Sequence, residues 1–331
     1  MLFKDDQVAR SQHEAVRTNA GWHRWTHDLV EVKGNDAASF LDYLYVNSVA
    51  ITPVGSSKYT TMLNELGQIT DDVIVMHISE GVYWVSTLYA PQLISWMDEH
   101  VADLDVVYRN ITKEKDMFSV QGPNSKALVN QLVSAPVDSM EKFSMIEAKI
   151  NGIEVTVHRG GFTGEDGYEI YCDIGSSDDI KAAIGETGKG MSAIELTILE
   201  VYVRSLPVEK GFALRQDIYG LSPYECGLGW SVDLSKDFIG KEAALQVKEE
   251  GAGRLLIGIE YEAESYEDIC QCERVYYHGI DIGFIRAAIY GYTVDKNIGF
   301  AVIQADKAIP GTKVTVGPNI SPAVIAQKRW V

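Results

Sequence analysis

The sequence predicts an α+β fold that ends in a small β-barrel, and three observations support this. A β-rich block over residues 58–87 is flanked by segments with helical periodicity. From Arg254 onward the pattern is one of short strands separated by glycine turns, which is typical of a small barrel or sandwich. A chain of 331 residues is also long enough for two or three domains, each with its own core.

In the first part of the chain, periodicity and turn residues predict helices and strands in a mixed order. Helices are expected to end near residue 20 and to span 36–44, where Asn35 or Asp36 is the N-cap, and 90–101. Strands are expected at 30–32, 58–63, 68–78 and 82–87. Turns at 64–67 and 80–81 separate the last three of these strands.

The middle of the chain continues this mixture. A strand from Phe118 is expected to run into a turn, and Asn124 or Ser125 then caps a helix through Leu132. Strands are expected on both sides of a glycine-rich turn within residues 150–173. Two further helices are expected, one over Ser192 to Val203 and one opening at Phe238 and lasting to about Glu250.

Composition excludes several classes of function. The formal net charge of −18, without clustered Lys and Arg, argues against nucleic acid as a partner. No apolar run approaches the roughly 20 residues that span a bilayer, and the start lacks a signal-peptide core, so we expect no membrane partner and a cytoplasmic location. Cys270 and Cys272 form a lone C-x-C without a second ligand pair, so we expect reduced thiols and no metal site.

The segment from His158 to Tyr171 joins a glycine-rich turn to a strand that carries a carboxylate. Glycines at 160, 161, 164 and 167 permit positive φ angles and close approach of the main chain to a ligand. Glu169 lies on the strand that follows, where alternation is clear. From these residues alone, a site that grips a flat polar ring and a tight hairpin with a solvated acid are both open.

Three separated motifs occur along the chain, and the second of them contains this turn. They are Asn64-Glu65-x-Gly67-x-Ile69-x-Asp71-Asp72, then Gly161-Phe162-Thr163-Gly164-Glu165-Asp166-Gly167-Tyr168-Glu169, and then Ser222-Pro223-Tyr224-Glu225-Cys226-Gly227-Leu228-Gly229-Trp230 leading to Asp237-Phe238-Ile239-Gly240-Lys241. In this order the chain resembles the aminomethyltransferase family, which includes the glycine cleavage T-protein and folate-dependent demethylases.

The resemblance implies a three-domain, ring-like fold with tetrahydrofolate in the central hole. We expect residues 1–250 to form a folate-binding region of two interleaved α+β domains, and residues 251–331 to form the C-terminal β-barrel domain. By resemblance, Glu169 pairs with the pteridine ring, whose amino group and ring N–H a carboxylate accepts together. Asp72 matches the catalytic carboxylate, with Asp71 as the alternative. The expected folate contacts also include Phe162, Tyr59 and Trp230.

Three departures from the family lie where we expect the one-carbon donor to be handled. Phe162 replaces a tyrosine, Ile194 stands where T-proteins usually have an arginine, and residues 201–212 replace a short turn. The chain is also shorter than T-proteins before Arg17. These features favour a donor other than the one used in glycine cleavage.

An aromatic N-terminal cluster supplies candidate donor residues. Trp22 and Trp25 offer large apolar surfaces, which suit a planar or methylated small molecule or, alternatively, a core wedge between domains. His27 is a second catalytic candidate because its ordinary pKa suits protonation of a leaving alkoxide or phenoxide. Further substrate candidates are Tyr202, Arg204 and Arg215, the arginines being suited to a carboxylate on the donor or on the folate tail.

The function predicted first is therefore a tetrahydrofolate-dependent methyltransferase that demethylates a small-molecule donor, with an O-methyl donor favoured. The alternative is a glycine cleavage T-protein, which takes an aminomethyl group from a lipoylated carrier protein. A non-enzymatic folate-binding protein of the iron–sulfur maintenance type is the third hypothesis. It ranks behind the others because the stretch from Lys236 to Lys241 lacks the expected cysteine.

Overall fold

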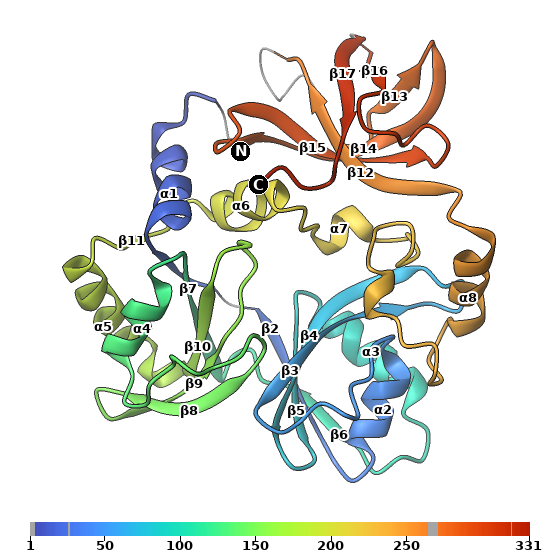
Figure 1. Ribbon diagram of the computed structural model, residues 1–331. Coiled ribbons are helices and arrows are strands. Elements are labelled where there is room, and N and C mark those ends of the chain that lie inside the picture. The colour runs from blue at the N-terminus through green and yellow to red at the C-terminus, as the bar shows by residue number, and fades with distance from the viewer. Residues whose placement is uncertain (1–3, 26, 264–270, 319) are drawn as a thin grey trace.

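The strands form three sheets that lie around a common centre (Figure 1). The computed structural model describes residues 4–25, 27–263, 271–318 and 320–331. Each sheet buries a separate apolar cluster, because each has its own helices or its own closed barrel to cover the hydrophobic face. The predicted α+β class with a terminal barrel is confirmed.

The first sheet is antiparallel and five-stranded, in the order β3-β4-β5-β2-β6. Its strands are β2 (Asp28–Lys33), β3 (Ser56–Leu63), β4 (Ile69–Ser79), β5 (Val82–Thr87) and β6 (Val107–Asn110). Helices α2 (Ala37–Leu44) and α3 (Ala90–His100) add Phe40, Leu41 and Leu93 to its core. This agrees with the expected elements. Asp36 does precede α2, but its side chain makes no capping hydrogen bond.

The second sheet has six strands in the order β11-β1-β7-β10-β9-β8. Its strands are β1 (Gly21–Arg24), β7 (Lys115–Gln121), β8 (Met145–Ile150), β9 (Ile153–His158), β10 (Gly167–Asp173) and β11 (Ile194–Glu195). Helices α4 (Ser125–Leu132) and α5 (Ser177–Gly190) cover it, with a single 3₁₀ turn, Ile174–Ser176, before α5. Only the β1–β11 pair is parallel.

The third sheet is the closed C-terminal barrel, in the order β12-β15-β14-β13-β16-β17. Its strands are β12 (Arg254–Tyr261), β13 (Arg274–Tyr277), β14 (Ile280–Gly291), β15 (Lys296–Gln304), β16 (Lys313–Val316) and β17 (Ser321–Ala326). All strands of the other two sheets come before residue 250. The division into two interleaved domains over 1–250 and a barrel domain over 251–331 remains our proposal.

The remaining helical elements lie between the sheets (Figure 1). They are α1 (Gln7–Thr18), a π-helical segment (Val201–Ser205), α6 (Leu206–Glu209), α7 (Arg215–Ile218), a 3₁₀ turn (Gly229–Ser231) and α8 (Lys241–Glu250). Glu209 of α6 is fully buried and joins several of these parts. Its Oε2 lies 3.0 Å from Arg17 Nη2 and 3.1 Å from His13 Nε2 on α1, and it accepts a 2.6 Å hydrogen bond from Thr293 Oγ1 of the barrel.

The helix predicted over Ser192 to Val203 is wrong for its first part, because helical structure begins only at Leu199 and continues as the π-helical segment. Ile194 and Glu195 instead form β11, the edge strand beside β1, where Ile194 N donates to Ala20 O and Leu196 N donates to Trp22 O. Sheet pairing therefore takes the main-chain donors that a helix needs. The helix expected from Phe238 begins only at Lys241, because Gly240 has a φ of 81° and interrupts it.

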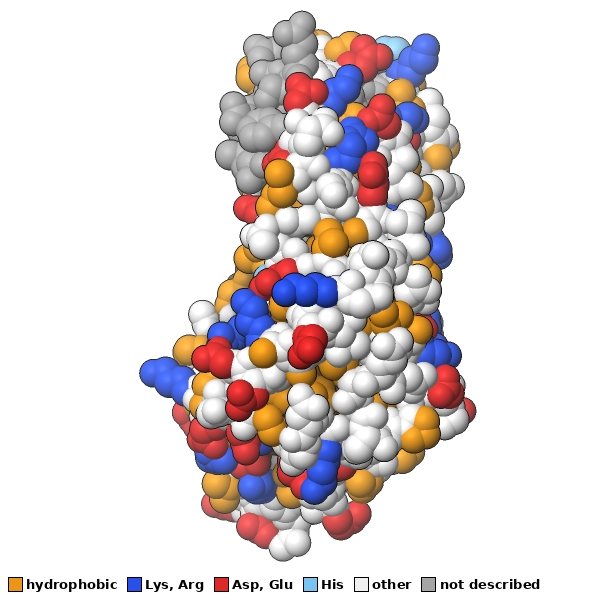
Figure 2. All heavy atoms as spheres, turned by 90° about the vertical axis from the view of Figure 1, so that its left-hand side faces the viewer, with side chains coloured by type: hydrophobic (Ala, Val, Ile, Leu, Met, Phe, Trp, Pro, Cys, Tyr) orange, Lys and Arg blue, Asp and Glu red, His pale blue; other side chains and the backbone are white. Residues whose placement is uncertain are grey.

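The surface gives no sign of a basic interface on the face that Figure 2 shows. There, Lys and Arg side chains are interspersed with Asp and Glu. Across the part of the chain that the structure describes, no helix combines the length and apolar character needed to cross a bilayer. Cys172, Cys226 and Cys272 are free thiols, whereas Cys270 lies outside the described residues.

Candidate functional site

A cavity of about 500 Å³ lies where the first two sheets meet the linking segments and the C-terminal tail. Its wall includes residues from β3, β4, β5, β9 and β10, from residues 202–230, and Lys328 and Arg329 near the end of the chain. A volume of this size is within the range of sites that bind cofactors and drug-sized ligands. The cavity is therefore the candidate functional site.

An irregularity in β4 comes directly before the two aspartates that line this cavity. Met62 pairs with Asp71, but the next residue, Leu63, pairs with Ile69, so no residue of β3 lies opposite Thr70 in the ladder. Such a bulge changes the local direction of the strand. The four residues that follow it, from Asp71 to Ile74, are all part of the cavity wall.

Asp71 is only 3% exposed and is held by three neighbours. Thr87 Oγ1 donates to its Oδ2 at 2.6 Å, Asp72 N donates to its Oδ1 at 3.0 Å, and Arg215 Nε lies 3.6 Å from Oδ1. Burial raises the pKa of Asp71 to about 6, although these partners favour the ionised form.

Asp72 has fewer partners than Asp71. Tyr59 donates its hydroxyl to Asp72 Oδ2 at 3.2 Å, and the Tyr59 ring stacks on Trp230 with 6.0 Å between centroids. Burial, followed by the charge of Asp71, raises the pKa of Asp72 to about 7. Asp72 is therefore able to gain and lose a proton near neutral pH.

Glu169 lies on β10, on the other sheet, and is 7% exposed. His158 Nδ1 lies 2.9 Å from Glu169 Oε2, and His158 Nε2 is hydrogen-bonded to Ser57 Oγ at 2.8 Å. Burial opposes ionisation of Glu169, but the hydrogen bond and charge of His158, with His27 behind them, lower its pKa overall. Glu169 is thus a fixed carboxylate at neutral pH.

The glycine-rich turn before Glu169 is built around Gln121. Gln121 Nε2 donates to Gly160 O, and Thr163 Oγ1 donates to Gln121 Oε1. A Cβ atom at Gly161 would lie 2.1 Å from the Gln121 side chain, so at this position the close approach is to protein. The turn still reaches the cavity, because Gly161 and Phe162 line it.

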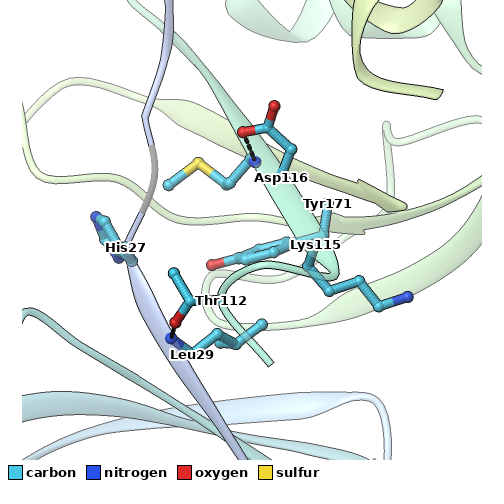
Figure 3. A pocket seen from close by; sticks show the side chains of 7 residues that line it. His27, Leu29, Thr112, Lys115, Asp116 and Tyr171 are labelled. Atoms are coloured by element: carbon cyan, nitrogen blue, oxygen red, sulfur yellow. Dashed lines mark hydrogen bonds between the residues drawn. The ribbon is translucent and has the colours of Figure 1, made fainter. Parts of the chain in front are cut away.

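His27 separates the large cavity from a second cavity of about 10 Å³ (Figure 3). The small cavity is near the minimum that holds one water, and Figure 3 shows the Tyr171 hydroxyl pointing toward His27. His27 Nδ1 is hydrogen-bonded to Ser86 Oγ at 2.6 Å. Burial lowers the pKa of His27 to about 4, so the neutral imidazole predominates at pH 7. A role as general acid would first require that His27 be protonated.

Hydrogen bonds connect His27 to Glu169 across the two sheets. Ser86 bonds to both His27 and Tyr171, and Tyr171 bonds to Glu169. With the contacts from Glu169 to His158 and from His158 to Ser57, the chain of bonds passes from β5 to β10 and back to β3. This network fixes the position of Glu169 relative to the first sheet.

An aromatic wall completes the site. Trp25 packs against Tyr202, with 5.6 Å between centroids, and Phe162 lies 6.1 Å from Phe212. The Tyr202 hydroxyl is hydrogen-bonded to Ser119. The buried Trp25 Nε1 has no hydrogen-bond partner among the residues that the structure describes.

The structure does not bring all of the predicted site residues to the cavity. Asp71, Asp72, Glu169, His27, Phe162, Tyr59, Trp230, Trp25, Tyr202 and Arg215 line it. Trp22 instead lies in the core of the second sheet and is 4% exposed. Arg204 makes two hydrogen bonds to the buried Asp217, and neither residue is part of the cavity wall. Ile194 also lies outside the wall, in β11, and packs in the same apolar cluster as Trp25 and Phe162.

Sequence reasoning missed several residues at the site. His158 comes directly before the glycine-rich turn and pairs with Glu169 across the hairpin. Its place in the sequence could therefore have predicted its contact with Glu169. Phe212 lies within residues 201–212. The sequence showed that this segment is unusual but did not single out Phe212. Nothing local marks Lys328, which reaches the cavity only because the C-terminal tail folds back beside Gly211.

Comparisons with known proteins agree with this fold. Residues 3–236 match the GCVT N-terminal domain, and residues 254–328 match the glycine cleavage T-protein C-terminal barrel domain. A protein of Bacillus subtilis named aminomethyltransferase is 34% identical over 93% of this chain and 86% of its own length. One of Halalkalibacterium halodurans with the same name is 33% identical over 93% and 85%. The crystal structure of the glycine cleavage aminomethyltransferase T of Bartonella henselae has a TM-score of 0.86 and 22% identity, covering 98% of this chain and 89% of that one, which supports the fold.

Proposed function

Because the chain belongs to the aminomethyltransferase family, it is a one-carbon transferase that uses tetrahydrofolate, and we propose that it transfers an aminomethyl group from a lipoylated carrier protein. One observation carries the proposal. The carboxylates of Asp72 and Glu169, which belong to two different sheets, line a single cavity. This arrangement separates a group that titrates near pH 7 from one that stays ionised.

The residues of the cavity fit tetrahydrofolate. A pterin presents an amino group beside a ring N–H, and the ionised Glu169 accepts both in one plane. The stack of Tyr59 on Trp230 adds aromatic surface to the cavity wall. When bound, tetrahydrofolate supplies the nitrogen that takes up the one-carbon unit.

Asp72 is the proposed catalytic base. Its carboxylate accepts the proton that the acceptor nitrogen loses as its bond to carbon forms. Tyr59 orients this carboxylate through its hydroxyl, and burial, followed by the charge of Asp71, keeps the pKa of Asp72 high. Glu169, held by His158, binds and orients the acceptor, which reduces the entropic cost of alignment.

The proposal is tested with purified protein, tetrahydrofolate and a carrier protein whose lipoyl group bears the aminomethyl unit. Expected products are methylenetetrahydrofolate and ammonia. The matched control is the same carrier without its lipoyl group. Absence of both products under conditions where the protein binds tetrahydrofolate would reject aminomethyl transfer.

A second candidate is the demethylation of a small-molecule donor, and the aromatic wall favours it. Trp25, Tyr202, Phe162 and Phe212 offer flat apolar surfaces next to the proposed folate site, which suits a methoxy aromatic. The neutral His27 would then act as a hydrogen-bond partner of the donor. Incubation with tetrahydrofolate and a panel of methoxy aromatics, methylated sulfur compounds and methylamines tests this candidate. Formation of methyltetrahydrofolate from one of them, with no activity on the lipoylated carrier, would reverse the ranking.

A further inference from the structure

Arg215 differs from the other partly buried arginines in the way its guanidinium is used. Arg17 makes four hydrogen bonds through its two terminal nitrogens, and Arg204 binds Asp217 through one of them with two bonds. Arg159 likewise binds Asp166 and Met140 O. For Arg215, the one hydrogen bond found within the described part of the chain is from Nε to Thr70 O, at 2.6 Å.

The position of this guanidinium is fixed. Thr70 O is available to Arg215 because Thr70 is the bulged residue of β4, and no residue of β3 lies opposite it in the ladder. The Arg215 Cζ atom lies 3.7 Å from the ring centroid of Tyr89 and 4.8 Å from that of Tyr219. Contact with two aromatic faces and one hydrogen bond restrains the side chain before any ligand arrives.

The free edge of Arg215 belongs to the cavity. Arg215 and Tyr89 both line it, as do Asp71 and Asp72. The Nε side of the guanidinium is taken by Thr70 O and faces Asp71 Oδ1 at 3.6 Å. What remains is the edge formed by the two terminal nitrogens, which matches the two oxygens of a carboxylate.

We propose that Arg215 binds a carboxylate of the ligand in this cavity, so that one of the two co-substrates is a carboxylic acid anchored beside Asp71 and Asp72. The inference rests on the proposed folate-dependent function. Two sources of the carboxylate share this chemistry. One is the glutamate tail of tetrahydrofolate, and the other is a carboxylated one-carbon donor. A lipoyl arm has no free carboxylate, so aminomethyl transfer requires the tail.

Binding measurements separate these sources without requiring turnover. Calorimetry gives Kd for tetrahydrofolate and for 6-methyltetrahydropterin, which has the ring but no carboxylate. A third titration adds 4-methoxybenzoate, or its uncharged amide, to protein saturated with 6-methyltetrahydropterin. The variants are Arg215→Met, Arg215→Lys and, as a loss of the same charge away from the cavity, Arg274→Met, whose side chain is exposed on the barrel.

We expect Arg215→Met to weaken tetrahydrofolate binding about 10- to 100-fold, since a hydrogen-bonded charge pair is lost, and to leave Kd for 6-methyltetrahydropterin unchanged. Arg215→Lys should lose less affinity for tetrahydrofolate, because it keeps the charge but not the forked geometry of the guanidinium, and Arg274→Met should lose little. If the donor is the source, Arg215→Met instead abolishes the preference for 4-methoxybenzoate over its amide and leaves both pterins unaffected.

Equal losses for both pterins, or no loss for any probe, would overturn the role of Arg215 while leaving the proposed function standing. Failure of the unaltered protein to bind either pterin would overturn the proposed function, and the inference with it. A melting temperature for each variant within a few degrees of the unaltered protein shows that it is folded.

Discussion

At the scale of single residues, burial changes the acidity of ordinary side chains. Asp71 and Asp72 lose solvent on the cavity wall, and the pKa values of these carboxyls rise to about 6 and about 7. Glu169 is buried as well, yet its pKa falls because His158 is hydrogen-bonded to it. The same kind of group therefore has two different roles at one site, decided by its neighbours.

Replacing Asp72 by Asn removes the proposed base and keeps an acceptor for Tyr59. We expect kcat to fall about 100-fold or more while Kd for tetrahydrofolate changes little. Steady-state kinetics and calorimetry check this. The matched control is Asp71→Asn, for which we expect a smaller loss of kcat. Loss of folate binding in Asp72→Asn would contradict the catalytic role and indicate a scaffolding one.

The activity should depend on the ionisation of Asp72. Since the base is active as a carboxylate, kcat should rise about tenfold per pH unit at low pH and level off above the pKa of Asp72, which is about 7. A pH profile of kcat measures this. A profile that falls as the pH rises through 7 would mean that the protonated form is the active one.

The raised pKa of Asp72 also has a cost in stability. An aspartate in the unfolded chain ionises near pH 4, whereas in the folded protein Asp72 resists ionisation up to about pH 7. The stability present below pH 4 is therefore lost as the pH rises through 7. We expect the melting temperature of Asp72→Asn, relative to the unaltered protein, to be higher at pH 8 than at pH 4. An equal difference at both pH values would contradict this pKa.

His158 is a further residue whose effect is testable. Without its imidazole, the strongest influence that lowers the pKa of Glu169 is lost, and burial raises the pKa of that carboxyl. His158→Ala should weaken tetrahydrofolate binding about tenfold, with a larger loss at pH 6 than at pH 8. Ser57→Ala, which removes the outer hydrogen bond of His158 and keeps its bond to Glu169, is the control and should lose less affinity. A loss independent of pH would point to packing instead.

At the scale of elements, small irregularities place the functional groups. The bulge at Thr70 comes directly before the two aspartates of the cavity wall and leaves a carbonyl for Arg215. The segment from Val201 to Ser205 is π-helical, and it puts Tyr202 on the cavity wall while Arg204 binds Asp217.

Arg204 therefore stabilises the structure around the site and does not line the cavity. Arg204→Met leaves the fully buried Asp217 without its charged partner, which costs about 3–5 kcal/mol of folding free energy. We expect a clear fall in melting temperature and a much smaller change in Kd for tetrahydrofolate. The double variant with Asp217→Asn should recover part of the stability. A change in folate binding without a change in stability would instead support the substrate role first expected for Arg204.

At the scale of the whole molecule, one buried carboxylate ties the parts together. Glu209 accepts from α1 through Arg17, from the barrel through Thr293, and its backbone carbonyl accepts from Trp330 in the C-terminal tail. The tail then brings Lys328 and Arg329 to the cavity. The site is thus assembled from the first and second sheets, the linking helices and the end of the chain.

Glu209 should make stability sensitive to acid. Burial opposes its ionisation, but His13, Thr293 and Arg17 together lower the pKa of Glu209 to about 2. Its contribution is present above the unfolded pKa near 4 and is lost as the pH falls toward 2. Glu209→Gln should therefore lower the melting temperature strongly at pH 7 and much less at pH 3. A difference that does not shrink at low pH would show that the charge of Glu209 is not what matters.

Much of this architecture was predictable from local patterns. Strands β3, β4 and β5, helix α4 and the barrel follow alternation, periodicity and glycine turns, and the structure confirms them within a few residues. Edge strand β11 was not predictable, since its two residues depend on pairing with β1, which lies far away in sequence. The π-helical segment likewise depends on tertiary packing, which overrides local propensity.

The sequence by itself determined the family and pointed to the two carboxylates of the proposed site, because short motifs in a fixed order carry that information. Only the tertiary structure decided which of the remaining candidates reach the cavity. Trp25 and Arg215 do, whereas Trp22 and Arg204 are used in the core and in an ion pair. The physical reason is that a side chain's partner is chosen by chain segments distant in sequence, so its availability to a ligand appears only once those segments are packed together.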